Sequence, residues 1–297
     1  MVSVLICTRN RASRLRQSLA TVGNAVQGWD GQIEVVVIDN GSEDVTPDLL
    51  AELSARHDYL RMVYDLRPGK SGALNRALMQ LQGQVVLFTD DDVHVPRSWI
   101  HDMAAPILDG QCDAVAGRVV LANDLARSWL TPKLREVLAE LTDVSGDLPG
   151  MVGANMAARV GVARSIGFDE SLGPGARGFA DDVLFNLRLK DGGWKIRGCD
   201  GPPVEHHLDP SRLTRAAMLD LAVGNGKSHA YVWHHWLHTD LDLLRVRKWR
   251  ADLRVAGYRL ANSPKEDAIA EREYDLAYSA AFLAALIAEK DTVPHYV

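Results

Sequence analysis

Three consecutive carboxylates, Asp90, Asp91 and Asp92, are the residues of this sequence best suited to chemistry. They follow the apolar run 85–88, which is typical of a buried strand. Adjacent carboxylates repel one another, and a divalent cation would relieve that repulsion, since Mg2+ and Mn2+ take carboxylate oxygens together with substrate phosphates. A solvated acidic turn, favoured by the dipole of a helix that starts at Pro96, explains the same residues without a metal. Both interpretations remain open on these three residues alone.

Two further polar groups come directly after apolar runs earlier in the chain. They are Thr8, Arg9, Asn10 and Arg11 after residues 2–7, and Asp39, Asn40, Gly41 and Ser42 after residues 33–38. Each group by itself has the composition of a polar turn. In a parallel sheet, however, ligands bind beyond the carboxyl ends of the strands, so three polar groups at strand ends together indicate a binding site.

The elements that must position these groups alternate along the chain. Strands are expected at residues 2–7, 33–38, 60–64, 85–88 and 114–121, and helices at about 15–26, 46–53, 71–81 and 96–110. This alternation predicts an α/β fold with a mostly parallel sheet and helices on both of its faces.

The later part of the chain is patterned differently. Periodicity fades over residues 122–149, and it returns with an apolar segment at 151–158, a helix at 181–190 and strands at 195–197 and 204–206. Residues 213–297 carry no strand pattern. They predict two or three helices with a break at 262–265, where Pro264 interrupts the helical spacing.

Composition restricts the class of protein further. The chain has 297 residues, 47% of them hydrophobic and 24% charged, which suits an ordinary globular protein with a sizeable core. A formal charge of −6 argues against nucleic acid as a partner. Its apolar runs are too short to span a bilayer, and the first residues lack the charge order of a signal peptide. The three widely spaced cysteines predict no disulfide framework, hence a reducing cytoplasm.

Six segments of the sequence occur in the order of one known family. They are VSVLICTRNR, VVVIDNGSED, GKSGALNRAL, VVLFTDDDV, GANMAARVGVARSIGFDESLGPGARGFADDVLFNLRL and VEHHLDPSR. Together they resemble the large family 2 of inverting glycosyltransferases with a GT-A fold, and their combined order is far more specific than any one of them. The resemblance implies a GT-A catalytic domain at residues 1–212, with a nucleotide-binding half at 1–121 and an acceptor half at 122–212. A helical extension would follow at 213–297.

The same resemblance implies roles for individual residues. The nucleotide-sugar would be bound by Thr8, Arg9, Arg11, Asp39, Lys70, Asn75, Asp90 and Asp91. Of these, Asp39 would contact the base. Asp92 and His206 would bind a divalent metal, Mn2+ or Mg2+, with His207 as the alternative to His206. Asp182 would be the catalytic base.

One motif departs from the family pattern. The usual Gly-Glu-Asp reads Ala180-Asp181-Asp182 here, and the shorter first carboxylate affects the partner role of Asp181 more than the base role of Asp182. Carboxylates in a first helical turn are also favoured by the helix dipole without any catalysis. In the implied reaction, a carboxylate takes the proton of an acceptor hydroxyl while the metal stabilises the leaving diphosphate, and one displacement inverts the anomeric carbon.

Two rival functions stay open beside the transferase. A sugar nucleotidyltransferase also uses an acidic metal pair, but it usually has a glycine-rich loop after its first strand, and residues 8–12 contain no glycine. An inactive homologue that only binds nucleotide-sugar is the other. A dinucleotide-binding domain is excluded because no Gly-x-Gly-x-x-Gly follows the first strand. The expected partners are a UDP-, GDP- or dTDP-sugar donor and a glycan, lipid-linked or small-molecule acceptor. A homo-oligomer is also compatible with the sequence.

The C-terminal region carries tryptophans close to basic residues. Trp233, Trp236 and Trp249 precede or lie within a run that contains Arg245, Arg247, Lys248, Arg250 and Arg254. The tryptophans are expected to pack against the rest of the protein, and the basic run suggests peripheral contact with the inner face of a membrane. A third interpretation is a metal site formed by His234, His238 and Asp242, which share one helix face at four-residue spacing.

Overall fold

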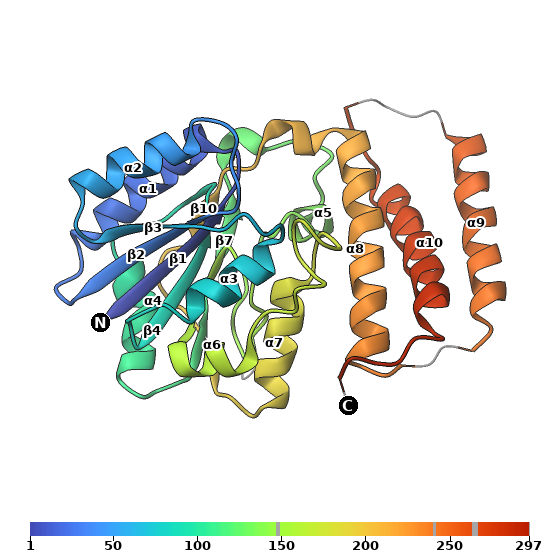
Figure 1. Ribbon diagram of the computed structural model, residues 1–297. Helices are drawn as coiled ribbons and strands as arrows, with labels where there is room; N and C mark the ends of the chain where they lie inside the picture. Colours follow the sequence, from blue (N-terminus) through green and yellow to red (C-terminus); the bar gives the residue numbers. More distant parts are fainter. Residues whose placement is uncertain (147–148, 240–241, 263–266, 297) are drawn as a thin grey trace. The chain divides into compact units, whose positions relative to one another are not determined.

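The computed structural model describes residues 1–146, 149–239, 242–262 and 267–296 (Figure 1). They form two compact units. The sheet unit comprises Met1–Ala126, Arg135–Ser171 and Asp181–Leu208, and the helical unit comprises Arg127–Leu134, Leu172–Ala180 and Asp209–Val297. The helical unit therefore includes two inner segments that the sequence division at residue 212 did not assign to it.

A seven-stranded, mostly parallel sheet forms the centre of the sheet unit. In spatial order its strands are β3 (Leu60–Tyr64), β2 (Ile33–Asp39), β1 (Val2–Thr8), β4 (Val85–Asp90), β8 (Asn155–Arg159), β6 (Ala114–Ala116) and β9 (Ile196–Gly198). The first four are mutually parallel, and β8 runs antiparallel to both of its neighbours. The predicted α/β fold with a mostly parallel sheet is confirmed.

The central strands β1, β2 and β4 are largely apolar because helices cover both faces of the sheet. Along β1, Val4 and Ile6 belong to one core, whereas Leu5 between them belongs to the other. The first core is closed by α1 (Ala12–Val26), α2 (Thr46–Arg56) and α4 (Trp99–Leu108). The second is closed by α3 (Lys70–Leu78), α6 (Val160–Ile166) and α7 (Asp181–Asp191). Successive side chains of a strand point to opposite faces, so a strand covered twice needs a continuous apolar run.

A second, three-stranded sheet corrects one sequence prediction. Its order is β5 (Val93–His94), β10 (Val204–His206) and β7 (Val119–Leu121). Residues 114–121 are thus not one strand but two, since β6 belongs to the large sheet and β7 to the small one. The change occurs at Gly117, where an added Cβ would lie 2.1 Å from the Asn155 amide nitrogen. The chain passes this side chain too closely for any residue but glycine.

Smaller differences concern the ends of elements and the region of weak periodicity. Helix α4 begins at Trp99 rather than at Pro96, after the cap residue Ser98. The region of faded periodicity at residues 122–149 contains a 3-10 turn, η1 (Asn123–Leu125), and the short helix α5 (Pro132–Glu136). The three cysteines are free, as predicted.

Three long helices make up most of the helical unit. They are α8 (Arg215–His235), α9 (Leu244–Ala261) and α10 (Glu271–Glu289), preceded by the 3-10 turn η2 (Pro210–Leu213). Helices α8 and α10 approach closely at Gly226, where a Cβ would lie 2.7 Å from the backbone oxygen of Tyr278. Most of the predicted break at 262–265 falls outside the described residues. Within the described residues, no helix is long and apolar enough to cross a membrane.

Trp233 and Trp236 pack against aromatic rings of the helical unit itself, whereas the sequence predicted that they pack against the rest of the protein. Trp233 meets the Phe282 ring edge-on at a centroid distance of 5.3 Å, and Trp236 meets Tyr296 at 5.1 Å. Trp249 does not share this environment, because 61% of it is exposed. The alternative metal site is not supported either, since a ring nitrogen of His234 lies 3.0 Å from the backbone oxygen of Thr292.

Candidate active site

The ends of three neighbouring strands bring the first polar groups together. In the parallel register, Thr8 at the end of β1 lies beside Asp39 at the end of β2, and Cys7 lies beside Asp90 at the end of β4. Residues 31 and 83 positions apart in the chain therefore meet at one edge of the sheet, as predicted for the carboxyl ends of parallel strands.

The Asp39 side chain is fully buried, and among the described residues only one of its two carboxylate oxygens accepts a hydrogen bond. Its Oδ1 accepts a hydrogen bond of 2.8 Å from the backbone N–H of Ser42, across a turn in which Gly41 has a φ of 76°. Its Oδ2 has no hydrogen-bond partner among the described residues. A buried acceptor without a donor costs free energy, so this oxygen is suited to receive an N–H from a bound ligand.

Asp91 faces the loop that follows β1. Its carboxylate accepts hydrogen bonds from Thr8 Oγ1 at 2.7 Å and from Arg11 Nη1 at 3.0 Å. Burial raises the pKa of Asp91 to about 6, although the Arg11 charge opposes this rise. Asp91 therefore ties the loop after β1 to the end of β4, and its charge is already compensated within the protein.

Asp92 is buried beside two cationic or potentially cationic side chains. Arg11 Nη1 donates to its Oδ2 at 2.7 Å, and His206 Nε2 lies 3.2 Å from its Oδ1. Burial alone would raise the pKa of Asp92, but His206 and Arg11 outweigh it and hold that pKa well below its usual range. Asp92 is thus an anion at all ordinary pH values.

His206 comes from a strand remote in sequence, and its ring is 6% exposed. Its Nδ1 has no hydrogen-bond partner among the described residues. One ligand atom each of Asp90, Asp92 and His206 lie within 4.8 Å of one another, a spacing that could hold a metal ion. Two carboxylates and one imidazole form a mixed oxygen and nitrogen donor set of the kind that Mn2+ accepts.

His207 points away from this group. Because side chains alternate along a strand, Glu205 and His207 lie on the opposite side of β10 from His206. There they join His94 of β5 in a second group whose ligand atoms also lie within 4.8 Å of one another. The geometry therefore separates the two adjacent imidazoles: that of His206 contacts the Asp92 carboxylate, whereas His207 reaches Asp92 through its backbone, its N–H donating to the Asp92 backbone oxygen at 2.8 Å.

Lys70 and Asn75 both lie on α3, but Lys70 contacts an aspartate at the end of β4, whereas Asn75 contacts the backbone of Phe168. Lys70, in the first turn, donates to Asp90 Oδ1 and forms an ion pair with it. Burial opposes its charge, but Asp90 and Asp181 outweigh this effect and raise its pKa. Asn75 instead binds the backbone of Phe168, donating to its oxygen at 2.8 Å and accepting from its N–H at 2.7 Å. Its amide is used to hold that loop, which leaves no geometric support for its predicted contact with nucleotide.

Asp181 and Asp182 open α7 and line one small pocket with Lys70 and Asp90. The Asp182 carboxylate is oriented by two backbone donors, the N–H of Gly153 at 2.9 Å and that of Val183 at 2.8 Å. Burial raises the pKa of both carboxyls, that of Asp181 to about 6, and the Asp182 charge contributes to the rise at Asp181. Raised pKa values near neutrality suit groups that take up protons.

Two arginines near the loop after β1 have surroundings that the sequence did not predict. Arg9, predicted to line the nucleotide pocket, is exposed. Arg14, which the sequence analysis did not select, donates from Nη1 to the backbone oxygen of His207 and so fastens the end of β10. The signal was present in the spacing, because Arg14 follows Arg11 by three residues and lies on the same side of α1.

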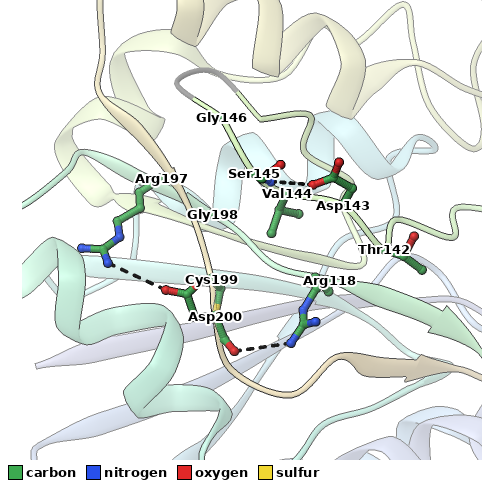
Figure 2. A pocket seen from close by; sticks show the side chains of 10 residues that line it. All are labelled: Arg118, Thr142, Asp143, Val144, Ser145, Gly146, Arg197, Gly198, Cys199 and Asp200. Carbon is green, nitrogen blue, oxygen red and sulfur yellow. Dashed lines mark hydrogen bonds and ion pairs between the residues drawn. The ribbon is translucent and has the colours of Figure 1, made fainter.

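A separate polar pocket lies at the ends of β6 and β9 (Figure 2). Its lining includes Arg118, Asp143, Arg197 and Asp200. Arg118 donates to the backbone oxygens of Asp200 and Gly201 at 3.3 and 2.6 Å, and Arg197 lies 3.9 Å from the Asp200 carboxylate. Both arginines thus already have partners within the protein, and none of these residues belongs to the predicted site.

The chain belongs to glycosyl transferase family 2. The model of that family matches residues 3–167, which contain β1, β2, β4 and the three aspartates at the end of β4. The mostly parallel α/β fold agrees with membership of this family of glycosyltransferases. The predicted family and enzyme class are confirmed.

Curated relatives include proteins whose names contain a lipid. The chain is 29% identical to a beta-monoglucosyldiacylglycerol synthase of Trichormus variabilis over 47% of its own length and 30% of that protein. It is 30% identical to a dolichol-phosphate mannosyltransferase of Pyrococcus furiosus over 47% of its length and 38% of that protein. A probable glycosyltransferase of Bacillus subtilis, YdaM, is 26% identical over 66% of this chain and 48% of that protein. The chain therefore spans at most about half the length of these relatives.

Solved structures share the fold at low sequence identity. The mannosyltransferase PcManGT from Pyrobaculum calidifontis, in complex with GDP-Man and Mn2+, has a TM-score of 0.63 at 19% identity, covering 97% of this chain and 86% of that one. Glucosyl-3-phosphoglycerate synthase from Mycobacterium tuberculosis, with Mn2+, UDP and phosphoglyceric acid, has a TM-score of 0.55 at 22% identity. That match covers 79% of this chain and 78% of that one.

Proposed function

We propose that this protein transfers a sugar from a nucleotide-diphosphate donor to a hydroxyl acceptor with inversion, using a divalent metal and Asp182 as the base. The observation that carries the proposal is the convergence of three different features in the sheet unit. They are the unpaired buried oxygen of Asp39, the Asp92–His206 pair, and the carboxylate pocket that opens α7. Residues 1–212 form the catalytic part in this proposal.

The donor would lie along the ends of β1, β2 and β4. Asp39 Oδ2 accepts an N–H of the base, and Thr8 and Arg11 shape the adjoining loop through their bonds to Asp91. Lys70, now paired with Asp90, supplies positive charge close to the sugar and the diphosphate. UDP and GDP carry N–H donors on their bases and fit this role.

The residues present fit a divalent metal. Asp90, Asp92 and His206 offer three ligand atoms in one place, and Asp92 is held in its anionic form. A bound Mn2+ or Mg2+ would stabilise the charge of the departing diphosphate. The imidazole nitrogen favours Mn2+ over Mg2+, since Mg2+ prefers oxygen ligands only. Arg11 and His206 compensate the Asp92 charge in the metal-free protein.

Asp182 performs the proton transfer in this mechanism. The two backbone N–H groups fix its carboxylate and leave further lone pairs free to accept the proton of the acceptor hydroxyl. As the acceptor oxygen attacks the anomeric carbon, the bond from that carbon to the diphosphate breaks and the proton passes to Asp182. A single displacement inverts the anomeric configuration and needs no covalent sugar–protein intermediate. Burial raises the pKa of Asp182, and the charge of Asp90 contributes to the rise, which makes its carboxylate a stronger base.

The acceptor we propose is a lipid-linked hydroxyl on the cytoplasmic side of a membrane. The names of the relatives support this class, since diacylglycerol and dolichol phosphate are both lipids. Free cysteines fit a reducing compartment, in which nucleotide-sugars are available as donors. The product would then enter the synthesis of a larger glycan or glycolipid.

A donor screen followed by an activity measurement tests the proposal. Thermal stability is measured with UDP, GDP and dTDP, each with and without Mn2+. At one hundred times the dissociation constant, a ligand adds about 2.7 kcal/mol and raises the melting temperature by roughly 5–10 °C. Slow release of nucleotide diphosphate from the matching sugar donor then distinguishes an enzyme from a binding homologue. Formation of pyrophosphate from a sugar phosphate and a nucleoside triphosphate would instead identify a nucleotidyltransferase.

A further inference from the structure

Helix α9 has apolar side chains on two opposite sides. On the inner side, Ala251 is buried and Val255 and Tyr258 are half-buried, as expected from the packing of α9 against α10 (Figure 1). The outer side carries Val246, Trp249, Leu253 and Leu260, which are 41%, 61%, 52% and 90% exposed. Their spacing of three, four and seven residues places them in one line along the helix. We call these four residues the outer stripe.

The outer stripe is bordered by basic side chains. Helix α9 contains Arg245, Arg247, Lys248, Arg250, Arg254 and Arg259, with Asp252 as its single acidic residue. Asp252 is engaged by Lys248 at 2.6 Å. At about 100° per residue, Arg250 and Arg254 follow one edge of the stripe, while Arg245 and Arg259 follow the other. The helix carries a formal charge of +5 in a chain whose net charge is −6.

We propose that α9 docks this enzyme on an anionic lipid surface. The outer stripe would lie at the boundary between headgroups and acyl chains, with the helix parallel to the membrane plane, and the flanking arginines would contact lipid phosphates. An 18-residue helix is about 27 Å long, so all four stripe residues reach the surface together. Trp249 is the aromatic residue of the stripe, and tryptophan favours this interfacial depth.

The charge of the helix decides between a lipid surface and a second copy of the chain. A symmetric contact through the outer stripe would bring two helices of charge +5 side by side, because a two-fold interface pairs the same patch with itself. Anionic lipid headgroups neutralise that charge instead of doubling it. The proposal concerns the helical unit and does not depend on the proposed catalytic roles.

The first experiment compares two kinds of vesicle. The full chain is mixed with vesicles of phosphatidylcholine alone, or of phosphatidylcholine with phosphatidylglycerol, and sedimented at low and at moderate salt. We expect binding to the anionic vesicles only, and weaker binding as salt screens the arginines. The tryptophan emission should shift to shorter wavelength on binding. In Trp249→Phe this shift should be lost while sedimentation persists, which assigns it to the outer stripe.

Matched variants separate the stripe from general surface effects. Leu253→Glu should lower vesicle binding at least tenfold, because it places a carboxylate in the inserted face. The triple change Arg245→Gln, Arg250→Gln and Arg254→Gln should lower it about a hundredfold, at about fivefold for each arginine. Val293→Glu and Arg272→Gln, at exposed positions of the same unit, are the controls and should bind as the wild type does.

Each remaining outcome overturns the proposal. No sedimentation with anionic vesicles at low salt would do so, as would binding that Leu253→Glu leaves unchanged. A concentration-dependent dimer that Leu253→Glu dissociates, without vesicle binding, would assign the stripe to a second copy. Circular dichroism confirms the fold of each variant. Hydrolysis of donor in solution should be equal in wild type and Leu253→Glu, so that a failure here is distinguishable from a failure of the proposed catalysis.

Discussion

Replacing Asp182 by Asn changes the proposed base while preserving its shape. The side-chain oxygen of Asn can still accept the hydrogen bond from the Gly153 N–H, which is 2.9 Å long in the wild type. The raised pKa of Asp182 means that the folded protein already disfavours its charge. A neutral amide relieves that cost, but its NH2 cannot accept the hydrogen bond that the Val183 N–H donates in the wild type. These two effects oppose one another, so the melting temperature should change little.

The loss of rate follows from the role of a general base. Such a group contributes between about a hundredfold and ten-thousandfold, and a hundredfold corresponds to about 2.7 kcal/mol of activation free energy. We expect Asp182→Asn to turn over at least ~100-fold more slowly, while its affinity for donor and Mn2+ stays the same, because Asp182 contacts neither in the proposed mechanism. Asp181→Asn should lose much less, since Asp181 takes up no proton in the proposed mechanism.

The assay follows release of nucleotide diphosphate from the donor that gives the largest thermal shift, with Mn2+ present. Donor affinity is measured by titration in the same buffer. A slow Asp181→Asn beside a nearly normal Asp182→Asn would refute the assignment and make Asp181 the base. Weakened donor binding in Asp182→Asn would show that the residue positions the donor instead.

Three further changes test other parts of the site. Asp92→Asn should keep the fold but lose the metal-dependent part of donor binding, and an unchanged metal requirement would contradict the role of Asp92. Arg11→Gln leaves the buried Asp91 and Asp92 carboxylates without their shared cation, so Mn2+ should raise the melting temperature of this variant more than that of wild type; an equal rise would be evidence against the metal site. Lowering the pH from about 7 to about 5 should stabilise metal-free wild type more than Asp181→Asn, because a carboxyl with a folded pKa of about 6 binds its proton in the folded state first. Equal pH dependence in calorimetry would show that the Asp181 pKa is not raised.

Much of the sheet could be predicted from the sequence because its strands are buried on both faces. The apolar runs that became β1, β2 and β4 are continuous, and parallel pairing places their carboxyl ends at one edge. The pattern of apolar runs therefore suffices to bring the acidic group and the loop after β1 together. The strand expected at 114–121 was wrong because its interruption depends on the contact of Gly117 with Asn155, 38 residues away, which no local pattern records.

Residue type could indicate candidates for the site, but it could not indicate which side chains and backbone groups each candidate contacts in the folded protein. Asn75 has a residue type that suits a ligand contact, yet its amide holds the backbone of Phe168. Arg9 and Arg11 are equivalent in the sequence, but only Arg11 turns toward Asp91 and Asp92. These differences arise from packing between elements, so that sequence spacing alone could not distinguish a partner inside the protein from a ligand.

The sequence by itself determined the family, the alternation of strands and helices, and the acidic strand end, since each depends on residues close together in the chain. Only the tertiary structure decided which histidine meets Asp92, because the alternation of side chains along β10 turns His206 inward and His207 outward. The packing of the C-terminal tryptophans likewise depends on the tertiary structure. Trp233 packs on Phe282, while Trp249 remains exposed on α9, because only one side of that helix packs against α10.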